Sequence, residues 1–205
     1  MSTRGDNSAM EWSRRTTGCV PVIILDVDRG LDFTFDGLRL IGNRPNTVIA
    51  EKDLIIFLRN SNYIEKEIRE FALEDSRAAW DFLIRKNSLT LEDILEAHRI
   101  LMQRVAPEIA GVLRTRGVRI GGGYGLRHEE VPDALNDWIT RCKSLSSADD
   151  IKRAHIEFER IHGFQDGNGR IGRILLNWQR VKLGLPILII FAVEKEIYYL
   201  WFKQK

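Results

Sequence analysis

The residues of this chain that could do chemistry lie close together, between His162 and Arg173. The stretch reads His162-Gly163-Phe164-Gln165-Asp166-Gly167-Asn168-Gly169-Arg170, and Arg173 follows three residues later. It combines a side chain that can accept a proton near neutral pH, a carboxylate that suits a hard metal ion, and two guanidiniums. Such a combination suits chemistry on the phosphates of a nucleotide.

The spacing predicts how these parts work together. The glycine-rich turn 167–169 lets backbone N–H groups converge, and the helix that follows directs the positive end of its dipole at the same point. Arg170 and Arg173 are three residues apart, so they share a helix face from which guanidiniums can bind phosphate oxygens. Asp166 can hold a Mg²⁺ ion that also binds phosphate, and His162 is the candidate proton acceptor.

Each of these features has an ordinary structural interpretation when it is taken alone. A Gly-Asn-Gly turn usually connects two helices, a single histidine is more often structural than catalytic, and arginines on a helix usually face solvent. The order and spacing of all of them in one loop favour the functional interpretation. Phe164, the apolar residue in the middle, is expected to be buried and to anchor the loop.

The stretch resembles the signature of the Fic family, H-x-F-x-[DE]-G-N-G-R-x-x-R, and it matches every fixed position. Many members have proline after the histidine, where this chain has Gly163. The resemblance extends over roughly residues 70 to 200. It implies a mainly α protein, a Fic-type helical bundle with a short β-hairpin flap, and the activity of a protein adenylyltransferase, or AMPylator.

The resemblance also implies the roles of the site residues. His162 is expected to be catalytic and to deprotonate a Ser, Thr or Tyr hydroxyl of the target protein, while Asp166 holds Mg²⁺. ATP is the expected donor of AMP, and autoAMPylation is a further expectation. The residues expected to bind the nucleotide are Phe164, Gly167, Asn168, Gly169, Arg170, Arg173 and Tyr198, with Tyr199 as the alternative to Tyr198.

Two other functions stay open at this point. Some relatives transfer a phosphoryl group or another phosphate-containing group, although that branch commonly has lysine where this chain has Gly169. A catalytically silent, nucleotide-binding regulator is the other alternative. The intact histidine, acid and arginine pair argue against it.

A glycine-rich segment, residues 118–125, interrupts the helical pattern. Its alternation followed by glycines resembles the flap that Fic proteins place beside the active loop, where the target protein docks by strand addition. The alternative is an ordinary flexible loop. His128, near its end, is not expected to be catalytic, and His98 and His155 are expected to be packing residues.

Many Fic proteins carry an inhibitory helix, [ST]-x-x-x-E-[GN], whose glutamate pairs with the second arginine of the signature, here Arg173. Two stretches match its first five positions: Thr47 to Glu51 and Ser61 to Glu65. Both are followed by lysine rather than Gly or Asn. A third stretch resembles the end of the motif but has Gly42 in the place of the glutamate, and the sequence favours this one over Glu51 and Glu65.

Length and periodicity predict a single domain with small additions. The chain has 205 residues, of which 44% are apolar. Residues 1–19 are expected to be a mobile tail, 20–60 an N-terminal arm with a small β arm and the possible inhibitory helix, and 61–205 the Fic catalytic core. Apolar spacing predicts helices from Thr47 to Leu58, from Tyr63 to Leu83 as one or two helices, from Thr90, from Ser146 or Ser147 to the signature, from the signature to Gly184, and from Glu194 to the end.

Composition excludes several classes of protein. The 31 basic and 29 acidic residues nearly balance, which argues against a dedicated nucleic-acid-binding protein. No apolar run is long enough to span a membrane, and we expect no secretion signal. Cys19 and Cys142 are expected to be free thiols in the cytoplasm, and a zinc site of His155, His162 and Asp166 is not favoured. The family resemblance allows a homodimer.

Overall fold

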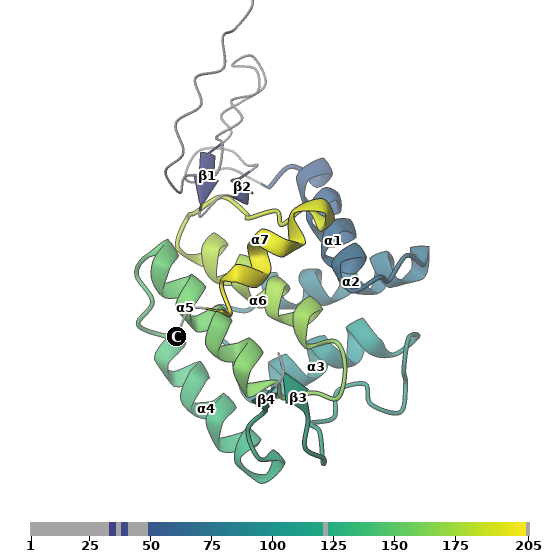
Figure 1. Ribbon diagram of the computed structural model, residues 1–205. Coiled ribbons are helices and arrows are strands. Elements are labelled where there is room, and N and C mark those ends of the chain that lie inside the picture. Colours follow the sequence, from purple (N-terminus) through teal and green to yellow (C-terminus); the bar gives the residue numbers. More distant parts are fainter. Residues whose placement is uncertain (1–32, 36–37, 41–48, 121–122, 204–205) are drawn as a thin grey trace, which may run out of the picture.

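The computed structural model describes residues 33–35, 38–40, 49–120 and 123–203. Most of these residues are helical, which confirms the predicted mainly α class (Figure 1). The α-helices are α1 (Glu51–Ile64), α2 (Glu70–Ile84), α3 (Leu91–Met102), α4 (Val131–Cys142), α5 (Ala148–Ile161), α6 (Asn168–Lys182) and α7 (Lys195–Leu200). Two 3₁₀ turns, His128–Glu130 and Ala192–Glu194, precede α4 and α7.

Two short antiparallel strand pairs accompany the helices. Strand β1 (Phe33–Phe35) pairs with β2 (Leu38–Leu40). Strand β3 (Arg119–Ile120) pairs with β4 (Gly123–Tyr124). In Figure 1 the second pair lies at the same end of the molecule as the beginning of α6.

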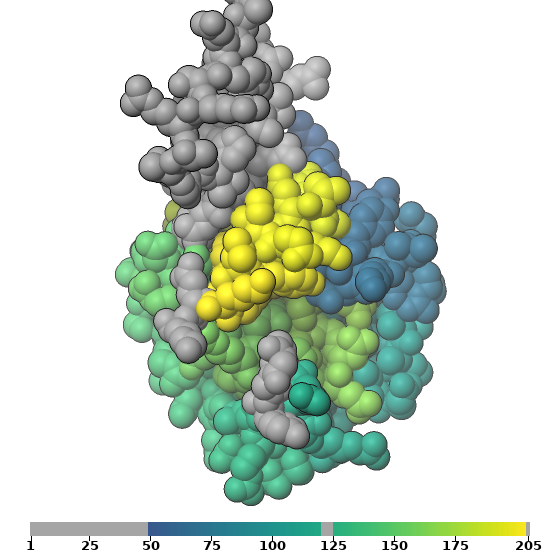
Figure 2. All heavy atoms as spheres, viewed as in Figure 1, coloured from purple at the N-terminus to yellow at the C-terminus, as the bar shows by residue number. Residues whose placement is uncertain are grey.

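Helix α6 is the centre of the bundle and packs against α1, α2, α3 and α5. Its apolar residues Ile171, Ile174 and Leu175 are buried in the main core. A helix that is buried on nearly all sides belongs in the interior of a bundle. The surrounding helices therefore fix the position of α6, and with it the loop that starts the helix. Figure 2 shows the C-terminal segment, in yellow, lying between the blue N-terminal helices and the green helices.

The predicted helix starts at Thr90 and Ser147 are confirmed. Thr90 and Asp93 form a capping box at the start of α3, and the Ser147 side chain accepts a hydrogen bond from the Asp150 N–H at the start of α5. These caps satisfy N–H groups that a helix end leaves without partners.

Helix α1 differs from the prediction, because it continues past Leu58 to Ile64. The expected boundary between residues 60 and 61 therefore falls inside this helix. The apolar pattern continues from α1 into α2, so periodicity alone does not reveal the break at residues 65–69. Helix α4 was not predicted, although Leu135, Trp138 and Ile139 form its buried face.

Several expectations lie outside the described residues, including the tail 1–19, Cys19, Gly42 and Thr47. Within the described part of the chain, no helix has the length and hydrophobicity required to cross a bilayer.

Candidate active site

His162 ends α5 in a left-handed conformation, with φ of 50° and ψ of 59°. Its ring Nδ1 lies 3.1 Å from the backbone oxygen of Glu159. A carbonyl can only accept, so Nδ1 carries the hydrogen and Nε2 keeps its lone pair. Burial lowers the pKa of His162, and the nearby Arg114 guanidinium lowers it further. His162 is therefore neutral at pH 7 and can accept a proton at Nε2.

Asn168 holds the loop after His162 in shape. Its side-chain oxygen accepts from the Phe164 N–H at 2.9 Å, and its side-chain nitrogen donates to the Phe164 carbonyl at 2.8 Å. Both polar ends of the amide are thus used inside the loop. Phe164 is fully buried and stacks on His98 with 3.7 Å between ring centroids, which confirms its predicted burial.

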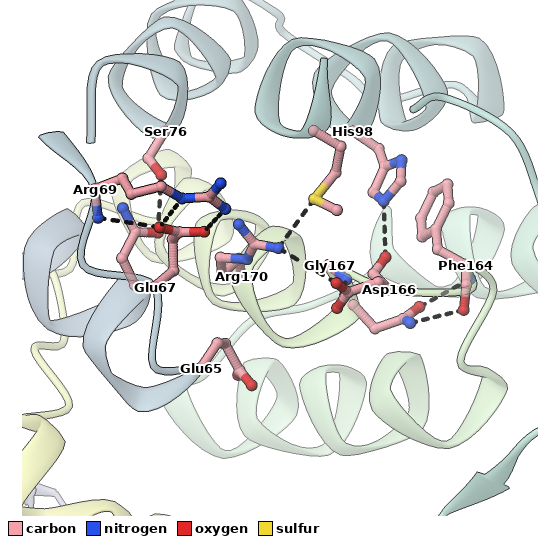
Figure 3. A network of polar contacts seen from close by, with 12 residues as sticks. Glu65, Glu67, Arg69, Ser76, His98, Phe164, Asp166, Gly167 and Arg170 are labelled. Carbon is pink, nitrogen blue, oxygen red and sulfur yellow. Dashed lines mark hydrogen bonds and ion pairs between the residues drawn. The ribbon is translucent and has the colours of Figure 1, made fainter. Parts of the chain in front are cut away.

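His98 connects α3 to the same loop, as Figure 3 shows. Its Nε2 donates to the Asp166 carbonyl at 2.9 Å, and its Nδ1 accepts from the Gly111 N–H at 3.0 Å. Burial lowers the pKa of His98 to about 4. Gly167 follows with φ of 79°, and a Cβ there would lie 2.9 Å from both His98 Nε2 and the Met102 sulfur. Only glycine fits this turn.

Asp166 extends its side chain from the loop into solvent, with 66% of the side chain exposed. One carboxylate oxygen accepts from the Gly167 N–H at 2.6 Å. No cluster of three or more His, Cys, Asp or Glu side chains suited to a metal occurs among the described residues. A single exposed carboxylate fits Mg²⁺, since that ion takes few protein ligands and completes its shell with waters and phosphates.

Arg170 is a buried guanidinium whose hydrogen-bonding capacity is largely unused. It is 3% exposed, and only its Nη2 has close partners: the Met102 sulfur at 3.0 Å and the Asp166 carboxylate at 4.0 Å. Its Nε and Nη1 have no hydrogen-bond partner in the described part of the chain. A buried charge in this state is costly unless an anion binds it. The first N–H groups of α6, which no helical carbonyl satisfies, begin at the same loop.

Arg173, one turn further along α6, is bound by Ser61 of α1 and by Glu65, the residue that follows α1. Its Nη2 donates to the Glu65 carboxylate at 2.8 Å and to the Ser61 carbonyl at 2.8 Å, while its Nε donates to the Ser61 hydroxyl at 2.9 Å. Glu51, the other matching glutamate, instead pairs with Arg77 of α2. Of the three candidates, the described residues place Glu65 on Arg173, although the sequence favoured Gly42.

The turn after α1 explains how Glu65 reaches this place. The N–H groups of Lys66 and Glu67 donate to the carbonyls of Tyr63 and Asn62, both at 3.0 Å, and Lys66 has φ of 61°. This is a Schellman motif, whose left-handed residue is usually glycine or asparagine. Lys66 occupies the position where the family motif has Gly or Asn, so the conformation is kept while the preferred residue type is absent.

Glu67 adds a second carboxylate on the side of Arg170 (Figure 3). It is held by Arg69, whose backbone N–H and Nε donate to it at 3.0 and 2.8 Å. The pKa of Glu67 falls to about 2, mainly through the Arg69 hydrogen bond, with a smaller contribution from Arg170. The α1–α2 turn therefore places the Glu65 carboxylate on Arg173 and the Glu67 carboxylate near Arg170.

Tyr198 of α7 packs behind Arg173, whose Cζ lies 5.7 Å from the tyrosine ring centroid. Nδ1 of His155 donates to the Gly172 carbonyl at 3.2 Å, so its Nε2 accepts from the Tyr198 hydroxyl at 2.9 Å. His155 is thus a packing residue, as expected. Tyr198 is buried, whereas the adjacent Tyr199 is only half-buried.

Sequence reasoning missed three residues of the site. Ser61 was noted only as the start of a motif match, yet its hydroxyl and its carbonyl each accept a hydrogen bond from Arg173. Glu159 has a buried carboxyl oxygen, and burial raises its pKa to about 7. Arg114 is 4% exposed and binds the carbonyl of His162. A charged residue gives no sequence signal that it will be buried, so only Ser61 could have been found.

Comparison with known proteins gives one family. Residues 88–179 match the model of the Fic/DOC family. The chain is 32% identical over 126 residues to protein adenylyltransferase Fic of Drosophila willistoni, which covers 59% of this chain and 25% of that protein. It is 34% identical over 119 residues to protein adenylyltransferase fic-1 of Caenorhabditis elegans, covering 55% and 23%. The chain thus spans about a quarter of the length of these relatives.

Solved structures agree on the fold. A Fic domain-containing signaling protein from Bacteroides thetaiotaomicron superposes with a TM-score of 0.67 at 21% identity, covering 75% of this chain and 72% of that one. Fic-1 from C. elegans superposes with a TM-score of 0.63 at 20% identity, covering 78% and 61%.

Proposed function

Because the chain belongs to the Fic/DOC family through residues 88–179, we propose that it is a protein adenylyltransferase. It transfers AMP from ATP to a Ser, Thr or Tyr hydroxyl of a protein and releases pyrophosphate. The observation that carries the proposal is Arg170, a buried guanidinium with two unpaired nitrogens at the start of α6. It lies in one loop with an exposed carboxylate and a neutral histidine, as a site for a magnesium nucleotide requires.

His162 acts as the general base. Its Nε2 takes the proton of the target hydroxyl, whose oxygen then bonds to the α-phosphorus of ATP. The bond from this phosphorus to the oxygen that bridges it to the β-phosphate breaks, and pyrophosphate leaves. Because burial lowers its pKa, the His162 imidazole is unprotonated at working pH and can accept this proton.

The start of α6 stabilises the negative charge of this reaction. Backbone N–H groups of 168–170 and the helix dipole face the phosphates, while Arg170 binds the leaving group. Asp166 would hold a Mg²⁺ ion, which would supply positive charge to neutralise the phosphates. The Asn168 side chain acts indirectly in this scheme, since both of its polar ends hold Phe164.

Glu65 inhibits the enzyme in the observed arrangement. It occupies the Arg173 guanidinium that would otherwise bind the phosphates, and it also fills the space beside Gly169, where a Cβ would lie 2.3 Å from its carboxylate oxygen. Productive binding of ATP therefore requires the Glu65 side chain to leave Arg173. The 35% exposure of that side chain gives it a route toward solvent.

The strand pair β3–β4 serves as the flap on which the target protein docks. In the chain, β3 and β4 follow Arg114, which contacts the His162 carbonyl, and precede α4. An extended target segment can add to such a pair through backbone hydrogen bonds. For the adenine ring, Tyr198 supports Arg173 from the core side, while the half-buried Tyr199 has surface left for contact.

The two alternative functions receive less support. In the branch that transfers phosphoryl groups, lysine commonly replaces the residue at 169, and a side chain there would overlap the Glu65 carboxylate. A silent regulator would not need a neutral histidine with a free Nε2 beside the loop.

Labelled ATP separates the three functions. The chain and its Glu65→Gly variant are incubated with cell lysate and ATP labelled at either the α- or the γ-phosphate. The proposal expects label on protein from the α-phosphate alone, and more of it with Glu65→Gly. Label from the γ-phosphate alone indicates phosphoryl transfer, and nucleotide binding without protein labelling indicates a regulator; either result contradicts the proposal.

A further inference from the structure

Arg114 is a buried cation outside the signature. It is 4% exposed, and no carboxylate among the described residues forms an ion pair with it. All the hydrogen bonds of its guanidinium go to backbone carbonyls. Burying a guanidinium whose partners are all neutral carbonyls costs free energy. We therefore expect Arg114 to have a role besides packing.

The four carbonyls belong to two different parts of the site. At the end of α5, Nε of Arg114 donates to the His162 carbonyl at 2.7 Å, and Nη2 donates to that of Ile161 at 3.4 Å. On either side of the β3–β4 pair, Nη1 donates to the Arg116 carbonyl at 2.9 Å, and Nη2 to that of Leu126 at 2.5 Å. One planar guanidinium thus forms hydrogen bonds both with the backbone of His162, the proposed base, and with the residues that flank strands β3 and β4.

The backbone around Arg114 strengthens this connection. Its N–H donates to the Gly163 carbonyl at 3.0 Å, and Leu113 and Phe164 form an isolated antiparallel bridge. The residues just before the hairpin are therefore paired with the residues just after His162. A hydrogen bond of 2.9 Å from the Gly125 N–H to the Val118 carbonyl closes the hairpin itself.

We propose that Arg114 is a positioning residue that fixes His162 relative to the target-docking hairpin and places an uncompensated positive charge beside that base. The proposal rests on the function proposed above, because it assigns a role to Arg114 in the transfer of AMP. The proposal has a geometric part, that Arg114 holds the hairpin in place relative to His162, and an electrostatic part, that its charge opposes protonation of His162. A separate measurement tests each part.

The charge of Arg114 is permanent, since a guanidinium does not lose its proton in proteins. It opposes protonation of His162, in addition to the larger effect of burial. Glu65, Asp166 and the Glu159 carbonyl favour protonation and act against it. Removing the charge therefore raises the pKa of His162, so that more of the base is protonated at a given pH and the acid limb of the transfer rate moves to higher pH.

The electrostatic part is tested by NMR titration of His162 in Arg114→Met and in the control Arg116→Met. Arg116 lies two residues away with an exposed side chain. The His162 signals are identified by their loss in His162→Gln. We expect a higher His162 pKa in Arg114→Met than in the wild type, and no change in Arg116→Met. An equal His162 pKa in both variants contradicts a role for the Arg114 charge.

The geometric part is tested by amide hydrogen exchange at Gly125. Arg114→Lys keeps the charge but cannot reach four carbonyls, so we expect exchange at Gly125 to be at least about tenfold faster than in Arg116→Lys, as the loss of one or two hydrogen bonds predicts. Equal exchange contradicts the positioning role, and this variant also decides the point should Arg114→Met fail to fold. Neither measurement needs transfer to occur, so a Glu65→Gly variant without AMP transfer would refute the proposed function and leave both results interpretable.

Discussion

Glu65 and Arg173 form an ion pair across the interface between α1 and α6, with 2.8 Å between the carboxylate oxygen and Nη2. The Arg173 side chain is 1% exposed, whereas that of Glu65 is 35% exposed. The arginine is thus fixed in the core, and the glutamate is the partner that can move. This asymmetry is what a releasable inhibitory contact requires.

Replacing Glu65 should activate the enzyme. We expect Glu65→Gly to raise the rate of AMP transfer about tenfold or more, because a charge-assisted hydrogen bond contributes about 1.5–3 kcal/mol and partial exposure reduces this. The measurement is incorporation of α-labelled AMP into protein. Glu51→Gly is the matched control, since Glu51 pairs with Arg77 instead. Equal activation by both variants would show that the Arg173 contact is not the inhibitory one.

Replacing Lys66 should stabilise the fold. Lys66 has φ of 61°, which strains a residue with a Cβ by about 1 kcal/mol. Since glycine also gains freedom in the unfolded chain, we expect Lys66→Gly to increase the free energy of unfolding by a few tenths of a kcal/mol, up to about 1. Lys66→Val should decrease it, because a β-branched side chain tolerates this conformation least. Urea denaturation measures both, and a more stable valine variant would contradict the assignment of a Schellman motif.

Protonation of His98 at acid pH should destabilise the folded chain. Burial lowers the pKa of His98 to about 4 in the folded chain, below its ordinary value of 6.5. The folded state thus binds fewer protons, so the contribution of His98 is complete above pH 6.5 and is lost as the pH falls toward 4. The full difference is roughly 3 kcal/mol. His98→Gln can still donate to Asp166 but does not titrate, so its unfolding free energy should fall less than that of the wild type between pH 7 and 4.5. An equal fall in the unfolding free energy of His98→Gln and of the wild type over this pH range would show that His98 does not have this role.

Asp166→Ala should remove the response of transfer to Mg²⁺. Its carboxylate is 66% exposed and is the only acidic side chain between His162 and Arg173. We expect the transfer rate to fall and to become independent of added Mg²⁺. The control is Asp149→Ala, which changes an acid in the first turn of α5. A Mg²⁺ dependence that survives in Asp166→Ala would move the ligand role to another residue.

The sequence predicts the loop better than the surroundings that control it. The order and spacing of the signature are local, so Phe164 and the turn at Gly167 could be anticipated from the pattern alone. The partner of Arg173 could not, because Glu65 is 108 residues away, Glu51 matches the same five positions of the motif, and the sequence favoured Gly42 over both. The backbone at Lys66 brings Glu65 to Arg173. Its left-handed conformation is unusual for lysine, so the residue type at this position does not predict it. Arg114 was missed for the same reason, since its partners are backbone carbonyls that carry no signal in the sequence.

The role of His162 as the base that takes the proton of the target hydroxyl is tested by comparing Glu65→Gly with Glu65→Gly/His162→Ala. We expect the double variant to lose incorporation of α-labelled AMP but to bind ATP with nearly the same affinity, because the base acts on the hydroxyl and not on the nucleotide. Transfer by the double variant at a rate near that of Glu65→Gly would contradict this role.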